Sequence, residues 1–279
     1  MEWKSPNCEV FVPDHVSDDL ALARTTHLCI AAHPDDIEIM AYHGIQHCFR
    51  QSEAWFTGVT LTQGAKSPRG GPYAAKTDQE MAKIRRLEQK KAAFVGEYGA
   101  QVLMGYSSDQ LKSGYEDIVQ DLIQILTKSK PKTIYLHSPA DKHETHVAAM
   151  AVAIQALRSC LPAYRPETVV GCEVWRDLDW LEEKVALEVS QAPHLAQALI
   201  AVFDSQISGG KRYDLATLGR RAANSVYHSA YQASHADALT WAIDLMPLID
   251  DPALNILEFT LAKVDQFKRS ISNRLARWS

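Results

Sequence analysis

The sequence predicts a Rossmann-like α/β fold, in which helices cover both faces of a mostly parallel sheet in three layers. Short apolar, β-branched and aromatic runs alternate along the chain with longer segments of helical periodicity. The connections are short, and no linker, low-complexity tract or internal repeat interrupts this order. A chain of 279 residues has room for one large domain or two small ones, and we expect a single domain over 1–279.

The expected elements follow from these two kinds of pattern. Apolar or β-branched runs predict strands over residues 28–32, 55–62, 101–106, 132–137, 168–175 and 185–189. Helical spacing of apolar residues predicts helices over residues 37–48, 77–98, 115–130, 141–157, 194–205 and 213–232. Thr77 and Glu80 form a capping box at the start of one helix, and Asp141 is expected to cap another.

A C-terminal helix is expected at about 254–278. Its apolar residues recur at alternating three- and four-residue spacing, with a lysine at position 268: Leu254, Leu257, Leu261, Val264, Ile271, Leu275 and Trp278. Such spacing suits packing along another helix. Packing on its own domain is favoured over a seam between two copies, because the pattern covers fewer than four heptads. A homo-oligomer is left open.

Composition excludes several classes of function. The net charge of -5 argues against nucleic acid as a partner, because phosphate binding requires a basic surface. The five cysteines are odd in number and form no Cys-x-x-Cys pair, which argues against a disulfide framework or a thiolate zinc site. The chain shows no signal-like N-terminus and no apolar run of about 18 residues, so we expect a cytoplasmic protein without a membrane span.

A first polar cluster, Ala-His-Pro-Asp-Asp-Ile-Glu at residues 32–38, lies where a predicted strand ends and a helix begins. Sites in open α/β sheets are built at this end of the strands. His33 and Asp36 can chelate one cation around a single turn, and Asp35 remains to act as a base. In the structural alternative, Asp35 or Asp36 is a helix N-cap and Glu38 completes a capping box, which leaves His33 and the other acid unexplained.

A second cluster, Asp-Lys-His-Glu-Thr-His-Val at residues 141–147, also follows a predicted strand. His143 and His146 are three residues apart and share a helical face. The zincin motif His-Glu-x-x-His is excluded, because it needs histidines four apart and position 147 is Val. The alternative is two solvent-facing histidines near a helix start, where the helix dipole disfavours a cationic imidazole.

Together the clusters supply three protein ligands, His33, Asp36 and one of the two later histidines, with a fourth position open. This is the arrangement of catalytic zinc, although another divalent metal is compatible with these ligands. Asp35 and the remaining histidine would serve as base and acid. Zinc makes water acidic enough to attack near neutral pH, so the pattern predicts a metal-dependent hydrolase.

The two clusters resemble the motifs of the LmbE-like (PIG-L) N-acetylglucosaminyl deacetylases. Residues 32–36 match the family's Ala-His-Pro-Asp-Asp run, with Ile37 standing before Glu38, and residues 143–147 match its His-x-x-His-Val segment. The resemblance implies an LmbE-like fold. It also implies zinc ligation by the histidines at 33 and 146 and the aspartate at 36.

The resemblance further implies roles for residues around the metal. It makes Asp35 the base that activates water and gives His143 a role in the tetrahedral intermediate and leaving group. Arg85 of an Arg-x-x-Glu pattern would border the substrate, whereas an exposed helical charge pair with Glu88 is the equal alternative. Asp109 would hold sugar hydroxyls, with Gln110 in place of the family's usual glycine. A Ser-Gln pair at 205–206 would support the site.

The expected activity is therefore zinc-dependent removal of an acetyl group from an amide nitrogen on a small sugar or sugar conjugate. The first alternative is an amidase that acts on a non-sugar N-acyl substrate. The second is a non-catalytic sugar-binding α/β protein, which would need neither cluster to be complete. The chain has no Gly-x-Gly-x-x-Gly motif and no P-loop, which weakens a nucleotide-binding version of that alternative.

Overall fold

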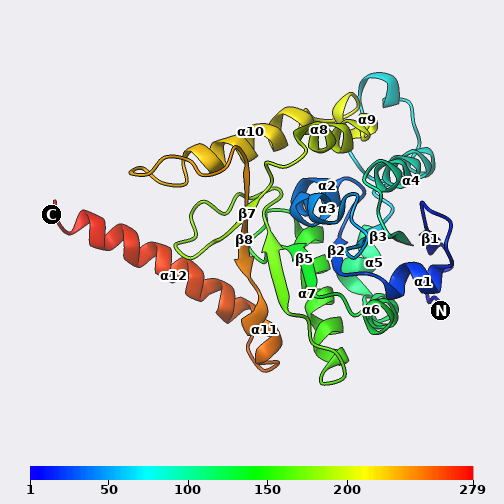
Figure 1. Cartoon of the computed structure of the whole chain (residues 1–279), viewed down its shortest axis with the longest axis horizontal. Helices are drawn as coiled ribbons and strands as arrows, with labels where there is room; N and C mark the ends of the chain where they lie inside the picture. The colour runs from blue at the N-terminus through cyan, green and yellow to red at the C-terminus, as the bar shows by residue number, and fades with distance from the viewer. Residues whose placement is uncertain (279) are drawn as a thin grey trace.

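The computed structural model describes residues 1–278, which contain one eight-stranded sheet in the order β1-β4-β3-β2-β5-β6-β8-β7 (Figure 1). Its five central neighbours run parallel: β4 (Ala100–Tyr106), β3 (Phe56–Thr62), β2 (His27–Ala31), β5 (Thr133–His137) and β6 (Thr168–Cys172). This arrangement confirms the predicted α/β fold with a mostly parallel sheet.

Antiparallel strands close both edges of the sheet. β1 (Glu9–Phe11) pairs with β4, while β8 (Leu239–Asp244) lies between β6 and β7 (Val185–Glu188). The sequence analysis missed β1 and β8. β8 has a strand-like composition, with Thr240, Trp241 and Ile243, but the preceding helix was expected to run to residue 232 and ends at Val226.

Helices cover both faces of the sheet, as Figure 1 shows. One face carries α1 (Asp18–Ala23), α5 (Ser108–Ser113), α6 (Glu116–Ser129), α7 (Glu144–Cys160) and α11 (Met246–Asp250). The other face carries α2 (Asp36–Met40), α3 (Tyr42–Cys48), α4 (Asp78–Val95), α8 (Pro193–Ala201), α9 (Asp204–Ile207) and α10 (Tyr213–Val226). A short 3₁₀ turn, η1 (Gly71–Tyr73), lies in the loop before α4.

The capping box predicted for α4 is confirmed. The Thr77 hydroxyl accepts a hydrogen bond from the Glu80 backbone N–H at 3.2 Å, and the Glu80 carboxylate accepts one from the Thr77 N–H at 2.9 Å. Two other predicted helices are divided. The 37–48 segment breaks at Ala41 into α2 and α3, and the 194–205 segment breaks before Asp204 into α8 and α9.

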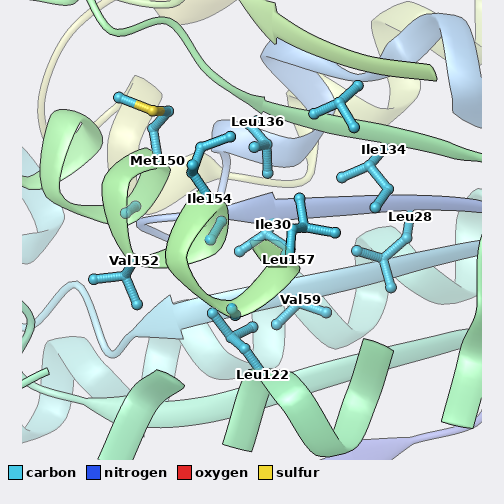
Figure 2. Close-up of a cluster of buried hydrophobic side chains, with 14 of the residues drawn as sticks. Leu28, Ile30, Val59, Leu122, Ile134, Leu136, Met150, Val152, Ile154 and Leu157 are labelled. Atoms are coloured by element: carbon cyan, nitrogen blue, oxygen red, sulfur yellow. The ribbon is translucent and has the colours of Figure 1, made fainter. Parts of the chain in front are cut away.

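The central strand β2 shows why its sequence lacks alternation. Leu28 and Ile30 pack into one buried cluster with α7 (Figure 2), whereas Cys29 and Ala31 point into the cluster on the opposite face. Because helices cover both faces, all four side chains are buried and apolar. The strand is thereby fixed firmly, and the chain that leaves its carboxyl end starts from a rigid position.

The C-terminal helix α12 (Ile256–Leu275) projects from the body of the molecule (Figure 1). It docks through Phe259, which is 7% exposed, and through an ion pair of 3.1 Å between Lys263 and Glu183. Of the predicted apolar stripe, Leu254, just before the helix, packs against the core. Six of its members are exposed: Leu257, Leu261, Val264, Ile271, Leu275 and Trp278. The expected packing face was therefore wrong, because spacing identifies residues on one face without showing which face is covered.

None of the helices formed by residues 1–278 combines the length and the apolar character needed to cross a bilayer.

Candidate metal centre and active-site cavity

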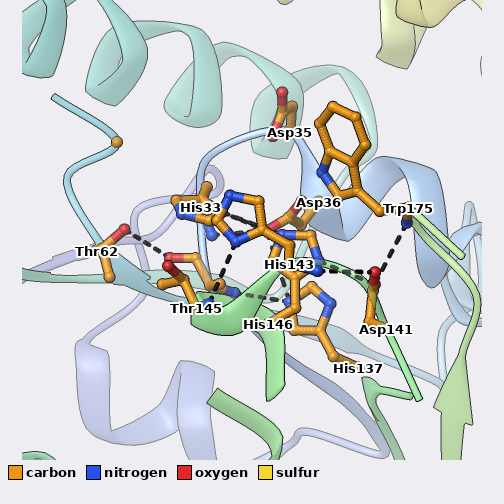
Figure 3. A network of polar contacts seen from close by, with 12 residues as sticks. His33, Asp35, Asp36, Thr62, His137, Asp141, His143, Thr145, His146 and Trp175 are labelled. Atoms are coloured by element: carbon orange, nitrogen blue, oxygen red, sulfur yellow. Dashed lines mark hydrogen bonds and ion pairs between the residues drawn. The ribbon is translucent and has the colours of Figure 1, made fainter. Parts of the chain in front are cut away.

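The candidate site lies at the point where the direction of strand succession reverses. From β2 the chain proceeds to β3 and β4 on one side, while β5 and β6 lie on the other side. A crevice forms outside the carboxyl ends of β2 and β5, where ligands bind in open α/β sheets. Both predicted clusters enter this crevice, since residues 33–38 follow β2 and residues 141–146 follow β5 (Figure 3).

Three side chains place donor atoms around one point. The Nδ1 atom of His33 lies 3.1 Å from Oδ2 of Asp36 and 3.2 Å from Nε2 of His146, and the last two atoms are 3.3 Å apart. Tetrahedral zinc with bonds of about 2.0–2.1 Å would separate its ligand atoms by about 3.3 Å. The donor types and their spacing therefore fit such an ion.

The charges of this trio are strongly coupled. Burial raises the pKa of Asp36, but His146 and then His33 outweigh that effect and hold it well below its usual range. Burial lowers the pKa of His146, yet Asp36 and Asp141 raise it to about 9. Burial lowers the pKa of His33 to about 4, which leaves that imidazole neutral at pH 7. Asp36 and Asp141 therefore favour positive charge in the space between them, as a cation site requires.

Asp141 orients His146 and does not cap the helix, which corrects the sequence-based expectation. Its Oδ2 lies 3.1 Å from Nδ1 of His146, and the carboxylate also accepts the N–H groups of Trp175 at 3.3 Å and Arg176 at 3.2 Å. The N-cap of α7 is His143, whose Nδ1 accepts the Thr145 N–H at 3.2 Å. A carboxylate on the far nitrogen of a ligand histidine fixes the ring and raises its basicity.

His137, which the sequence analysis did not single out, lies directly beneath the trio. It is fully buried at the end of β5 and stacks on His146 with 4.0 Å between ring centroids. Its Nε2 accepts the Ala32 N–H at 2.9 Å, so this histidine ties the end of β5 to the start of the first cluster. The sequence signal that could have identified His137 is its position as the last residue of the predicted strand that leads into the second cluster.

Asp35 occupies a strained position beside the trio. Its φ is 97°, in a region that non-glycine residues rarely adopt, and its backbone N–H donates to the Gln89 side chain at 3.1 Å. It stands at the N-cap position of α2 but makes no side-chain capping bond. Glu38 instead accepts from Gln89 at 2.8 Å and Tyr98 at 2.7 Å. The structural alternative of a capping box is therefore wrong.

Arg85 fixes the Asp35 carboxylate. One Nη2 to Oδ1 distance is 3.2 Å, and the same guanidinium donates to the carbonyl oxygens of Pro34 and, at 3.1 Å, Gly64. Burial raises the pKa of Asp35 to about 7, while Arg85 acts to lower it. Gly64 is required here, since its φ is 62° and a Cβ would lie 2.3 Å from Nη1 of Arg85.

Arg85 and Glu88 are both buried, so the alternative of an exposed helical charge pair is wrong. The Glu88 carboxylate accepts the Ser205 N–H at 2.8 Å and the Ser205 hydroxyl at 2.6 Å. These bonds attach α9 to α4, while Gln206 lines the cavity. The Ser-Gln pair therefore supports the wall of the site, as the resemblance implies.

The cavity above the trio has a volume of about 630 Å³. It is lined by His33, Asp35, Asp36, Arg85 and His143, which the sequence analysis had singled out. Asp109 also lines it from the exposed N-terminal turn of α5, where its carboxylate pairs with Lys66 at 2.8 Å. His146 itself lies in the floor and is fully buried. Trp175 also lines the cavity, with its ring centroid 6.2 Å from that of His143.

Comparisons with known proteins agree with this arrangement. The sequence model of the GlcNAc-PI de-N-acetylase family, PIG-L, matches residues 28–157, which span β2, both clusters and most of α7. No curated protein matches the sequence significantly.

Several solved structures share the fold at low sequence identity, each with a TM-score of 0.63. The conserved protein TT1542 from Thermus thermophilus is 19% identical, and the match covers 82% of this chain and 98% of that one. The N,N'-diacetylchitobiose deacetylase from Pyrococcus horikoshii is 16% identical, with coverages of 86% and 90%. GalB, the 4-carboxy-2-hydroxymuconate hydratase from Pseudomonas putida, is 15% identical, with coverages of 79% and 95%. The motifs, the fold and the family match agree, and residues 28–157 of the chain match the model of the LmbE-like (PIG-L) family.

Proposed function

We propose that this protein is a metal-dependent amide hydrolase that removes an acetyl group from a nitrogen on a small sugar or sugar conjugate. The observation that carries the proposal is the convergence of His33, Asp36 and His146 on one point beside Asp35. The family name, GlcNAc-PI de-N-acetylase, supports this reaction. The deacetylase from Pyrococcus horikoshii shows that the fold can host it.

Zinc is the proposed metal, held by His33, Asp36 and His146, although another divalent ion fits the same donors. Zinc in such a site supplies Lewis acidity and makes water acidic enough to attack near neutral pH. Two imidazole nitrogens and one carboxylate oxygen leave room for substrate and water on the cavity side. The remaining steps are assigned to residues of the chain.

Asp35 is the proposed general base. Its carboxylate lines the cavity and is held in place by Arg85. It accepts no capping hydrogen bond from the backbone of α2, so no N–H group of that helix occupies the oxygens that would accept a proton. It takes a proton from the attacking water and returns it to the amine nitrogen as the carbon–nitrogen bond breaks, because a departing amine needs that proton. The proton thus moves from water to Asp35 to the amine, and acetate leaves with the oxygen of the water.

His143 is the proposed hydrogen-bond donor to the developing oxyanion. Its Nδ1 accepts the Thr145 N–H, so the neutral ring carries its own proton on Nε2. Burial lowers the pKa of His143, which favours this neutral form. A neutral imidazole can donate a hydrogen bond without surrendering the proton, and the transfer to the amine is therefore assigned to Asp35.

The test combines metal content with product analysis. Elemental analysis of the purified protein should find about one divalent ion per chain, and incubation with N-acetyl sugars should release acetate and free amine in equal amounts. Release only from non-sugar amides would favour an amidase on another substrate class. Absence of both metal and acetate release would overturn the proposal and favour a sugar-binding protein. Because the hydratase GalB has the same fold as this protein, hydration of a double bond is a further activity to assay.

A further inference from the structure

One wall of the cavity, formed by residues 211–221, carries three positive charges that form no ion pair with an acid. Lys211, Arg220 and Arg221 all line the cavity, and none of them pairs with a carboxylate within residues 1–278. The Lys211 ammonium lies 4.2 Å from the ring centroid of Trp175. One Arg220 nitrogen donates to the carbonyl of Val174, and the neighbouring Arg221 also lines the cavity.

Arg221 is 3% exposed and forms no ion pair within the described residues, although its guanidinium carbon lies 4.9 Å from the centroid of the Tyr42 ring. Its Nη2 donates to the carbonyls of Glu38 at 2.8 Å and Ile39 at 3.1 Å, but Nε and Nη1 have no hydrogen-bond partner among the described residues. Burial lowers its pKa to about 10, which still leaves the guanidinium charged at pH 7. An uncompensated buried charge is costly, so the cavity is more stable when an anion is present.

The nearby acid does not supply that anion. Glu173 also lines the cavity, but one of its oxygens accepts from Asn224 at 2.5 Å and from the Trp241 N–H at 3.0 Å. The other oxygen accepts the Leu178 N–H at 3.1 Å. Burial raises the pKa of Glu173, while the N–H groups of Trp241 and Leu178 and the charge of Arg220 act to lower it, so Glu173 influences Arg220 without forming an ion pair with it.

A purely structural role explains only part of this wall. Arg221 could be retained because it binds the last carbonyls of the short helix α2, where a cation is favourable. That role uses one nitrogen and gives no reason for Arg220 and Lys211 beside it. The neighbouring Arg212 is different, since its guanidinium forms two bonds to Asp214 at 2.9 Å and 2.7 Å.

We propose that the cavity takes an acylated substrate bearing a carboxylate or phosphate group, and that Arg220 and Lys211 bind this oxyanion while its charge offsets that of Arg221. The proposal rests on the proposed function only for the acyl end of the substrate. The binding of an oxyanion by this wall can be measured separately. The substrate class inferred is therefore an anionic N-acetyl compound, and neutral N-acetyl sugars are poorer ligands.

The first experiment uses inorganic phosphate as the probe in calorimetric titrations of the metal-loaded protein. Arg220→Gln should weaken phosphate binding about tenfold or more, as the loss of a hydrogen bond to a charged group implies. Arg212→Gln is the matched control, because it removes a guanidinium from the same cavity lining whose charge Asp214 already neutralises. Phosphate bound at the metal would be unaffected by either change, so equal affinity in all three proteins, or no binding at all, overturns the proposal.

The second experiment compares N-acetylglucosamine with its 6-phosphate and with N-acetylmuramic acid, which carries a carboxylate. One or both anionic sugars should bind about tenfold more tightly than the neutral sugar, and Lys211→Gln and Arg220→Gln should reduce that preference. Equal binding of neutral and anionic sugars in the presence of acetate release would overturn this inference and leave the proposed function intact. Binding that depends on Arg220 without any acetate release would leave this inference intact and overturn the proposed function.

Discussion

The two ends of the cavity differ in how their charges are satisfied. At the metal end, His33, Asp36 and His146 face one another at 3.1–3.3 Å, and Asp141 completes the set behind them. At the cationic end, which is the wall formed by residues 211–221, Lys211, Arg220 and Arg221 make no ion pair within the described part of the chain, residues 1–278. The first end is preorganised for a cation, and the second requires an anion from outside.

The two ends are therefore assigned different tasks: the metal end would carry the reaction, and the cationic end would select the substrate. The metal end comes from segments within residues 28–157, the range that matches the family. The cationic end comes from α10 and the chain just before it, beyond that range. Structures with the same fold include a deacetylase and a hydratase, so the fold alone does not fix the substrate. Residues outside the matched range are where this chain would define its own substrate.

Replacing His146 by Ala should have the largest effect and should act on the metal end alone. The change removes one of the three proposed metal ligands, so elemental analysis should find little metal. Activity should fall on the order of 10⁴-fold, because Lewis acidity is worth several kcal/mol. Phosphate binding at the cationic end should persist. Normal metal content in this variant would refute the ligand set.

Replacing Asp35 by Asn should lower kcat on the order of 10²–10⁴-fold and leave the metal in place. Asparagine keeps the shape of the side chain but cannot accept the proton from water. Single-turnover acetate release, measured beside elemental analysis, separates this loss from loss of metal. Asp117→Asn, on the exposed first turn of α6, is the matched control and should retain activity. Full turnover by the Asp35 variant would remove the base from the mechanism.

Replacing His143 by Ala should lower kcat on the order of 10²–10³-fold, which is typical of losing one donor to an oxyanion. Metal content should not change, because the ring stands beside the donor trio and is not part of it. The loss should appear in kcat more than in KM, since the hydrogen bond strengthens only as negative charge develops. A change confined to KM would instead assign His143 to substrate binding.

The core of the metal end could be predicted from the sequence because each cluster is contiguous and follows a strand. His33 and Asp36 leave β2 and His146 follows β5, and the carboxyl ends of adjacent parallel strands meet at one edge. His137 and the orienting role of Asp141 could not be read in this way. Their partners, Ala32 and the loop at Trp175, are distant in sequence and are brought near only by the sheet.

The cationic end was not predicted, because nothing in the spacing of Arg220 and Arg221 distinguishes a buried arginine from an exposed one. Only Arg221 is buried, and its guanidinium contacts carbonyl groups of α2 and the Tyr42 ring, which are distant in sequence. The strand β8, against which α10 packs, was not predicted either. The same limit applies to α12. Its apolar spacing was read correctly, but contact with the domain is made by Phe259 on another side of the helix.

Replacing Asp141 by Asn should weaken metal binding about 10- to 100-fold, the usual effect of losing a carboxylate behind a ligand histidine. The single oxygen of asparagine can still accept the Arg176 N–H, whereas its NH2 group replaces the oxygen that accepts the Trp175 N–H and faces His146. Competition with a chelator measures the affinity directly, and zinc added in excess should restore activity. Unchanged affinity would show that Asp141 is not needed to hold His146, whose ring also stacks on His137 and His143.

Salt should have the smallest effect and should act on only one end. Raising the ionic strength from about 0.05 M to 0.5 M shortens the Debye length to less than half, and exposed charges such as Lys211 are screened most. The affinity for N-acetylglucosamine 6-phosphate should therefore fall about threefold, while that for the neutral sugar stays constant and metal content does not change. Arg220→Gln should flatten this dependence and Arg212→Gln should preserve it, because only the former removes an unpaired charge. Unpaired cations cannot attract an uncharged ligand over a long distance. Equal salt sensitivity for the neutral and the phosphorylated sugar would therefore show that the two ends do not differ electrostatically.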